Sequence, residues 1–175
     1  MTLDALKAGL LLFVAAVLQA SIMPSISLLG AVPNLLLVTL LSIALLRGAV
    51  FGAVCGFVAG LLLDTATLGT LGLTSLLLTV GAYWIGRYGE TTGRDRFHAP
   101  YVSVAVVTVL YGLGALALHF MLGDPVSARV VLVDALVPGL VFNLLLTAPV
   151  YALARRLLPP RDWSAERSGE VSLLG

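Results

Sequence analysis

Two aspartates at the borders of apolar segments, Asp64 and Asp134, are the residues whose chemistry would matter most in this sequence. Two carboxylates that share a proton are the catalytic pair of aspartyl proteolysis, including the form that acts inside membranes. The sequence contains no Gly-x-Gly-Asp stretch, however, and nothing in it shows that the two aspartates are adjacent. We therefore do not predict a protease.

Asp64 has two other interpretations. An acidic residue at the C-terminus of a helix opposes the helix dipole, so it needs an ion pair or a hydrogen bond there. It could cap the following turn through Thr65, Thr67 or the backbone of residues 69–72. It could also handle a proton or an ion. We expect Asp64 and Gly72 to form a turn with a structural or functional role, and the two interpretations stay open.

The other reactive side chains form no catalytic or metal-binding pattern. His98 and His119 fall on opposite sides of the membrane in the topology derived below, so they cannot share a metal ion. His119 alone could be a ligand, a proton relay or an interfacial residue. The single cysteine, Cys55, cannot form an internal disulfide. With no phosphate loop, Gly-x-Ser-x-Gly motif or Cys/His cluster, the sequence predicts no catalytic residue, cofactor or metal.

A glycine series follows, with Gly48, Gly52, Gly56 and Gly60 spaced every four residues. Glycine in a helix interior costs about 1 kcal/mol relative to alanine in water. In a membrane, a face of small residues offsets that cost because it lets two helices approach closely. The series predicts a packing face, which could meet either a partner protein's helix or another helix of the same bundle.

The elements that carry these residues must be membrane helices. Hydrophobic residues make up 59% of the 175 positions and charged residues 11%, and the mean hydropathy is +1.06. Soluble domains contain about 45–50% apolar and about 25% charged residues. The net charge of +1 suggests no nucleic-acid partner.

Charge-free runs define the spans, because a bilayer core needs roughly 20 apolar residues of helix. Residues 8–46 hold two spans, and the apolar run that begins there is too long for a cleavable signal peptide. We predict an all-α bundle of six helices in one domain, residues 1–158, and a short cytoplasmic tail, residues 159–175. The predicted spans are about 5–23, 33–46, 48–63, 71–86, 100–122 and 132–154.

Basic residues predict the orientation of the bundle. If the N-terminus is cytoplasmic, Arg129 is the only basic residue in the outer connections, and the other nine lie on the cytoplasmic side. This excess of basic residues on one side follows the positive-inside rule and places both termini in the cytoplasm. The basic residues on the cytoplasmic side are then Lys7, Arg47, Arg87, Arg94, Arg96, Arg155, Arg156, Arg161 and Arg167.

Polar side chains at membrane depth should face the interior of the bundle, where they find partners. Pro138 and Pro149 are expected to interrupt the sixth span on either side of Asn143. Discontinuous helices are one feature of solute sites in transporters. The polar residues in question are Gln19, Asn34, Ser42, Thr74, Ser75, Thr79, His119 and Asn143.

Three motifs between residues 29 and 90 resemble the rod shape-determining protein MreD family. They are Pro33-Asn34-Leu35-Leu36-Leu37, then Gly56-Phe57-x-x-Gly60-Leu61-x-x-Asp64, and then Leu71-Gly72-Leu73-Thr74. We count Pro33 and Asn34, together with Asp64 and Gly72, as residues of structural or functional turns.

The resemblance implies a component of the bacterial inner membrane that has no known catalytic activity. It implies binding to MreC, and a place beside the MreB filament, the RodA glycosyltransferase and its transpeptidase in the cell-elongation machinery. The glycine face and the Asp64 turn would then shape a surface for MreC's membrane helix. The family's bundle is thought similar to the substrate-binding subunits of energy-coupling-factor transporters, so a solute-binding subunit is the alternative function.

Overall fold

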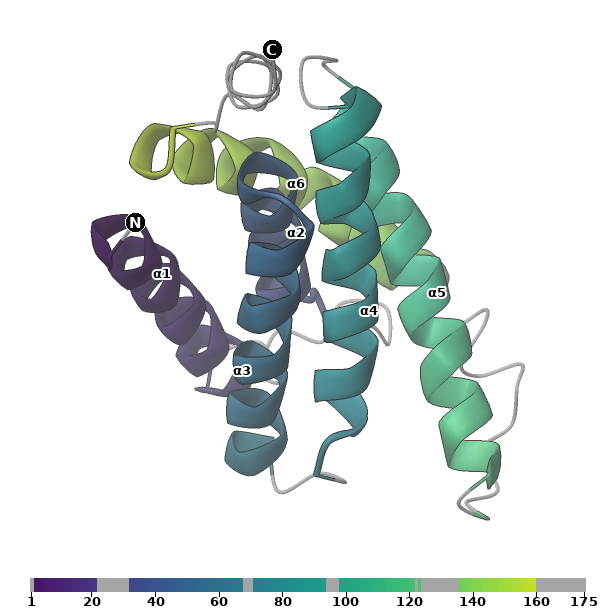
Figure 1. Cartoon of the computed structure of the whole chain (residues 1–175). Coiled ribbons are helices and arrows are strands. Elements are labelled where there is room, and N and C mark those ends of the chain that lie inside the picture. The colour runs from purple at the N-terminus through teal and green to yellow at the C-terminus, as the bar shows by residue number, and fades with distance from the viewer. Residues whose placement is uncertain are drawn as a thin grey trace, which may run out of the picture.

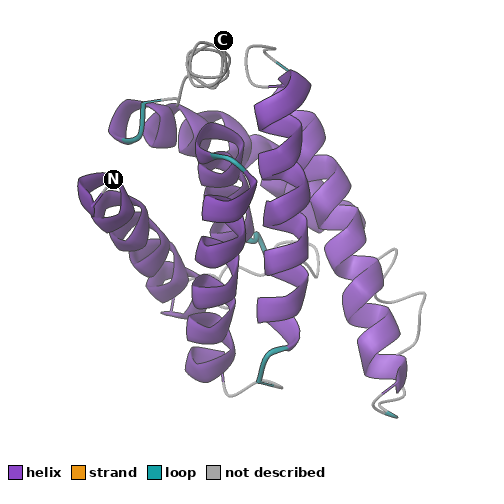
Figure 2. Ribbon diagram, viewed as in Figure 1, coloured by secondary structure: helices purple, strands orange, loops and turns teal. Residues whose placement is uncertain are grey.

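The computed structural model describes residues 2–21, 32–67, 71–93, 98–121, 123 and 136–159; apart from short turns and helix caps these residues are helical, with no strand among them (Figures 1 and 2). The prediction of an all-α protein is thus confirmed. The helices are α1 (Thr2–Ser21), α2 (Leu35–Arg47), α3 (Ala49–Thr67), α4 (Leu73–Tyr88), the π-helix η2 (Gly89–Gly93), α5 (Ala99–Met121) and α6 (Val137–Leu157).

Four of these helices are long and apolar enough to cross a membrane, namely Leu3–Ser21, Ala49–Thr67, Ala99–Ala117 and Val137–Leu157. The helix α2 is a shorter apolar helix of 13 residues. It would reach only about 20 Å at 1.5 Å per residue, less than a bilayer core of about 30 Å. Each predicted span overlaps one α-helix of the structure.

The short helix α2 forms the centre of the bundle. It contacts every other α-helix, and all its residues from Leu36 to Leu46 are buried. Its sequence, LLLVTLLSIALLR, is apolar on all sides, as a helix surrounded by other helices requires. The chain leaves α2 through Gly48, whose φ of 93° ends the helix.

The remaining helices surround α2 (Figure 1). The helices α3 and α4 form an antiparallel hairpin, α5 lies beside α4, and α6 crosses the bundle obliquely against α2 and α5. We call one end of the bundle the Arg47 end; it holds the α2–α3 junction, η2 and the start of α5. The opposite end, with the α3–α4 turn and the end of α5, is the Asp64 end.

The predicted interruption of the sixth span is wrong, because α6 is one continuous helix from Val137 to Leu157. Pro138 lies in the first turn, where a missing N–H breaks no helical hydrogen bond. Pro149 lies inside the helix and removes one such bond. A membrane helix tolerates that loss when neighbouring groups compensate it.

Candidate functional site

The glycine face of α3 packs directly against α4. A Cβ on Gly56 would lie 2.7 Å from the carbonyl oxygen of Leu78, and a Cβ on Gly52 would lie 3.0 Å from that of Ala82. A Cβ on Gly60 would collide with the backbone of Ser75. Since backbone atoms cannot move aside as a side-chain tip can, this interface needs glycine. In the structure the face therefore meets the chain's own bundle.

Gly48 does not belong to that face. It lies between α2 and α3 with a φ of 93°, a conformation that favours glycine, and its N–H donates to the carbonyl of Ala44 at 2.8 Å. The four-residue spacing of the glycines therefore includes Gly48 in the sequence, but the helix that presents the glycine face begins after it. Gly48 is a helix-ending residue.

Two further glycines extend the close packing toward the Arg47 end. A Cβ on Gly86 would collide with the backbone of Ala49, and a Cβ on Gly89 would lie 2.5 Å from the carbonyl oxygen of Leu45. Gly86 thus continues the α3–α4 interface, whereas Gly89 of η2 packs against α2. Their three-residue spacing in the sequence, after the small residue Ala82, is the available signal for this close packing.

The Asp64 turn joins α3 to α4. Asp64 is buried, with 3% of its surface exposed, and its Oδ2 accepts a hydrogen bond from the Gly72 backbone N–H at 2.8 Å. Gly72 has a φ of 93°, and no atom of the described residues lies within 4 Å of where its Cβ would be, so the backbone conformation calls for glycine here. Thr65 and Thr67 donate to carbonyls of α3 instead.

The helix α5 adds a tyrosine to this turn. The Tyr111 side chain is hydrogen-bonded to that of Thr74 in the first turn of α4. A contact from α5 thus supports the start of α4 beside the turn. Asp134 lies outside the described residues, and the side chain of His119 is likewise not described.

A second polar cluster surrounds the N-terminus of α2. Asn34 is the N-cap: its Oδ1 accepts from the Leu37 N–H at 3.0 Å. The Asn34 N–H donates to Oδ1 of Asn143 in α6 at 2.8 Å, and Nδ2 of Asn143 donates to the Thr108 hydroxyl in α5 at 3.1 Å. A helix N-terminus leaves N–H groups without partners, and in an apolar bundle these side chains supply the acceptors.

Gln19 of α1 completes this cluster. Its Oε1 accepts from the Leu35 N–H at 2.7 Å, and its Nε2 donates to the Pro33 carbonyl at 3.1 Å. Pro33 itself has no N–H to satisfy. The prediction that Gln19, Asn34 and Asn143 face the bundle is confirmed. Nothing in the sequence distinguishes Thr108, because a threonine hydroxyl in an apolar helix can also donate to a backbone carbonyl of its own helix.

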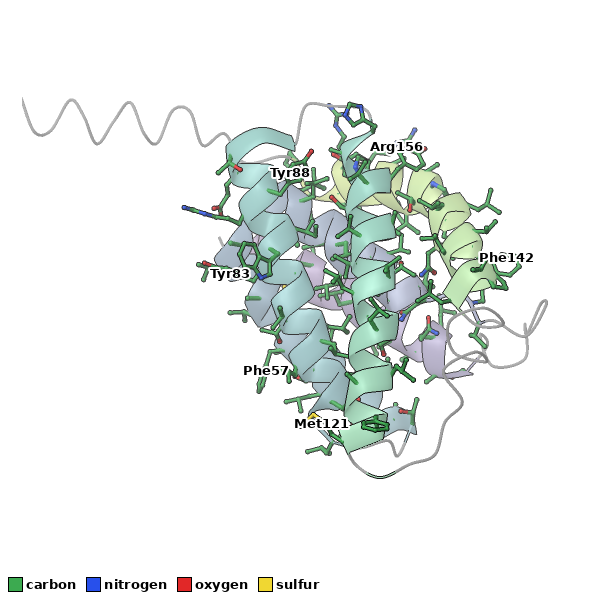
Figure 3. All side chains as sticks on the ribbon, turned by 90° about the vertical axis from the view of Figure 1, so that its right-hand side faces the viewer. Phe57, Tyr83, Tyr88, Met121, Phe142 and Arg156 are labelled. Atoms are coloured by element: carbon green, nitrogen blue, oxygen red, sulfur yellow. The ribbon has the colours of Figure 1, made fainter. Side chains whose placement is uncertain are left out.

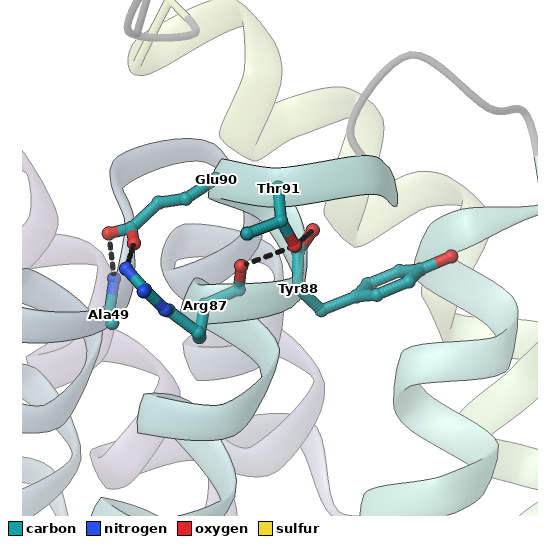
Figure 4. A network of polar contacts seen from close by, with 5 residues as sticks. All are labelled: Ala49, Arg87, Tyr88, Glu90 and Thr91. Atoms are coloured by element: carbon teal, nitrogen blue, oxygen red, sulfur yellow. Dashed lines mark hydrogen bonds and ion pairs between the residues drawn. The ribbon is translucent and has the colours of Figure 1, made fainter. Parts of the chain in front are cut away.

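The Arg47 end is held by charged residues (Figure 4). The Glu90 carboxylate accepts from the Ala49 N–H at 2.7 Å through Oε1 and pairs with Arg87 at 3.3 Å through Oε2. Negative charge at a helix N-terminus is favourable, so Glu90 caps α3 from another element. In the sequence, Glu90 falls between the predicted spans 71–86 and 100–122, where no local pattern indicates a capping role. Gly48, which directly precedes α3, has no side chain that could cap the helix. This is the one hint in the sequence that the cap must come from another element.

Most interior polar groups thus bond to neighbouring elements, the buried Ser103 hydroxyl being an exception without a partner among the described residues. In the described part of the chain, Gln19, Asn34, Asp64, Glu90 and Asn143 each bond to backbone or side chains of neighbouring elements. The same part contains no group of three His, Cys, Asp or Glu residues able to hold a metal ion. By contrast, labelled side chains such as Phe57 and Tyr83 point away from the bundle (Figure 3). These polar residues join helices.

Three comparisons with known proteins were made, and one of them gives the same family as the motifs at Pro33, Gly56 and Leu71. No curated protein and no solved structure matches the chain. A protein family does match, and the match runs over residues 3–157, well beyond the region that carries the motifs. Because that match includes all six α-helices, the chain belongs to the rod shape-determining protein MreD family.

Proposed function

We propose that the protein is a non-enzymatic scaffold of the bacterial cell-elongation machinery that binds MreC in the inner membrane. Membership of the family supports a membrane component of the cell-shape machinery. The observation that carries the proposal is that the interior polar side chains form hydrogen bonds within the bundle. Asn34, Asn143 and Asp64 satisfy helix ends and turns, which is the chemistry of a rigid bundle.

This use of polar groups also weighs against the alternative of a solute-binding transport subunit. Recognition of a polar solute needs donors and acceptors that converge on a cavity. Two cavities between described residues are lined mainly by apolar side chains. The scaffold is therefore the function that we carry forward, with RodA, its transpeptidase and MreB as further members of the complex.

We propose in addition that six helices cross the membrane, with both termini in the cytoplasm. In the described part, the basic residues Lys7, Arg47, Arg87, Arg155 and Arg156 belong to segments that start or finish at the Arg47 end (Figures 1 and 3). The positive-inside rule assigns that end to the cytoplasm. The short helices α2 and α4 are accommodated inside the bundle or by local thinning of the bilayer.

The scaffold is tested by purifying the native protein from its own membranes in mild detergent and identifying the proteins that accompany it by mass spectrometry. We expect MreC at a reproducible stoichiometry, with other elongation proteins at lower occupancy. Intact protein that repeatedly purifies without MreC, under conditions that preserve other membrane complexes, would contradict the proposal.

The topology is tested with single cysteines in a Cys55→Ser background. Cysteines at positions 28, 93 and 126 are labelled in whole cells with a membrane-impermeant maleimide. We expect positions 28 and 126 to react from outside, and position 93 to react only after the cells are opened. Labelling of position 93 in intact cells would reverse the orientation.

A further inference from the structure

The outward face of α4 changes in polarity along the helix. Its exposed residues recur every three to four positions, which places them on one side of the helix, and they are Leu76, Val80, Tyr83 and Arg87, with Trp84 beside them. From the Asp64 end to the Arg47 end this face is first apolar, then aromatic and then basic. A bilayer has the same order, because Trp and Tyr gather between the hydrocarbon core and the charged headgroups.

Two aromatic rings mark the change on α4. Tyr83 and Trp84 make an edge-to-face contact, with ring centroids 6.2 Å apart and an interplanar angle of 81°. Tyr83 points away from the bundle, and 65% of the Trp84 surface is exposed (Figure 3). Rings that combine an apolar body with a polar tip are favourable where hydrocarbon meets headgroups. The pair therefore marks one border of the hydrocarbon core.

The neighbouring helix α5 gives the same border. A Cβ on Gly81 of α4 would lie 2.8 Å from Cγ1 of Val107, so these two positions of the antiparallel helices are level. Val102, five residues before Val107, is then close to the level of Arg87. The exposed apolar residues of α5 begin at Val102, and the helix contains no Asp, Glu, Lys or Arg. Both helices thus place the border of the hydrocarbon core near Arg87.

Basic residues outnumber acidic ones at this end. Among the described residues the Arg47 end has two ion pairs, Asp4 with Arg47 at 2.8 Å and Glu90 with Arg87 at 3.3 Å. Each pair neutralises one basic residue. Three further basic residues of the same end have no ion pair with a described residue, namely Lys7, Arg155 and Arg156. The described part of this end therefore has a net positive charge.

The unpaired basic residues belong to two helix ends that lie close to each other. The start of α1 and the end of α6 are neighbours in both views of the bundle (Figures 1 and 3). Lys7 is in the second turn of α1, and Arg155 and Arg156 are exposed in the last turn of α6. Like charges near one another repel, so an anion beside them is stabilising. At the border of the hydrocarbon core, the available anions are lipid phosphates.

We propose that the Arg47 end is a binding surface for the headgroups of anionic phospholipids, with its strongest contact where α1 begins and α6 ends. The Tyr83–Trp84 pair sets the level of the headgroups, and Lys7, Arg155 and Arg156 supply the charge that attracts them. A guanidinium group can donate to two phosphate oxygens at once. Because a zwitterionic headgroup presents an ammonium group with its phosphate, the surface prefers headgroups of net negative charge. The proposal holds for either orientation of the chain in the membrane.

The level is tested by tryptophan fluorescence in bilayers that contain brominated phospholipids, which quench a nearby indole. The chain has two tryptophans, Trp84 and Trp163, so Trp163→Phe leaves Trp84 as the reporter. We expect bromine near the headgroup to quench Trp84 more strongly than bromine near the end of the acyl chain. The control is Leu113→Trp in a chain with both native tryptophans replaced by Phe. Leu113 lies midway along the exposed apolar face of α5 and should show the reverse order.

The charge preference is tested with Leu153→Trp in the same tryptophan-free chain, at an exposed position three residues before Arg156. Beside this reporter we expect brominated phosphatidylglycerol to bind about twofold or more tightly than brominated phosphatidylcholine. The preference should disappear when Arg155 and Arg156 are both replaced by Gln and remain when both are replaced by Lys. Leu113→Trp should show no preference between the two lipids.

Three outcomes would overturn the headgroup surface. Equal binding of the two lipids beside Leu153→Trp, or a preference that survives the double exchange to Gln, excludes these arginines as an anionic lipid site. Stronger quenching of Trp84 from the end of the acyl chain places the aromatic pair inside the hydrocarbon core. If neither lipid quenches Leu153→Trp while both quench Leu113→Trp, protein and not lipid covers the end of α6.

Discussion

The two sides of α3 use small residues in opposite ways. On the side of α4, glycines of α3 contact backbone atoms of α4, and a Ser75 hydroxyl crosses to the Phe57 carbonyl at 2.9 Å. On the side of α1, no atom of the described residues lies within 4 Å of the position that a Cβ on Gly9 would occupy, and a cavity of about 220 Å³ remains. The first interface leaves no room for a side chain, whereas the second does. A series of small residues thus predicts close packing, but not which helix packs there.

The largest effect is expected for Gly56→Leu, which places a side chain where the Leu78 carbonyl already lies. Overpacking a close-packed interior costs about 1–3 kcal/mol, and more where backbone must move. We expect a loss of at least about 3 kcal/mol in the free energy of unfolding, which is measured by reversible denaturation in detergent micelles. Gly9→Leu is the matched control and should unfold like the wild type. Equal destabilisation by both substitutions would remove the contrast between the two sides.

The next effect is expected for Gln19→Leu, which keeps the size of the side chain but removes the attachment of α1 to α2. The Leu35 N–H would lose its acceptor, and the Pro33 carbonyl would lose a donor. An unsatisfied buried group costs about 1–3 kcal/mol, and hydrogen bonds within membrane proteins average about 0.6 kcal/mol. We therefore expect about 1–2 kcal/mol of destabilisation.

The same Gln19→Leu variant should also loosen α1, because the two Gln19 hydrogen bonds attach this helix to the segment that begins α2. Hydrogen exchange measured by mass spectrometry should rise in α1 and stay unchanged in α3 and α4. Val17→Ala, at a position of α1 that is 46% exposed, serves as the control. Faster exchange spread evenly over all helices would argue against a separately attached α1.

Sequence reasoning succeeded where the physical cause was local. Charge-free runs located the helices because lipid excludes charge, and the Asp64–Gly72 hydrogen bond joins residues eight positions apart. The capping of Ala49 by Glu90 spans 41 positions and the Asn34–Asn143 bond spans 109, so neither follows from any local pattern. Gly48 was grouped with the α3 face because spacing alone cannot show that the helix is broken there by a positive φ.

A smaller effect is expected at the Arg47 end for Glu90→Ala, which removes the acceptor from the N-terminus of α3. Loss of a capping side chain costs about 1 kcal/mol. The ion pair with Arg87 adds little to this, since the Arg87 side chain is 62% exposed and exposed pairs contribute weakly. We expect about 1 kcal/mol of destabilisation for Glu90→Ala in the same denaturation assay.

Two further variants separate the contributions at this end. Glu90→Gln keeps a carbonyl acceptor near Ala49 and should recover part of the stability, whereas Arg87→Ala should change it by a few tenths of a kcal/mol at most. If Arg87→Ala destabilised the protein as much as Glu90→Ala, the ion pair and not the cap would hold the start of α3 against η2.

The smallest effect is expected for Gly9→Ala, and its sign is opposite to that of the others. Alanine is a better helix former than glycine by about 1 kcal/mol in water, and the added methyl group meets no atom of the described residues. We expect a stabilisation of less than about 1 kcal/mol in the isolated protein. Destabilisation by Gly9→Ala would mean that α1 already packs closely against another part of the chain at this position.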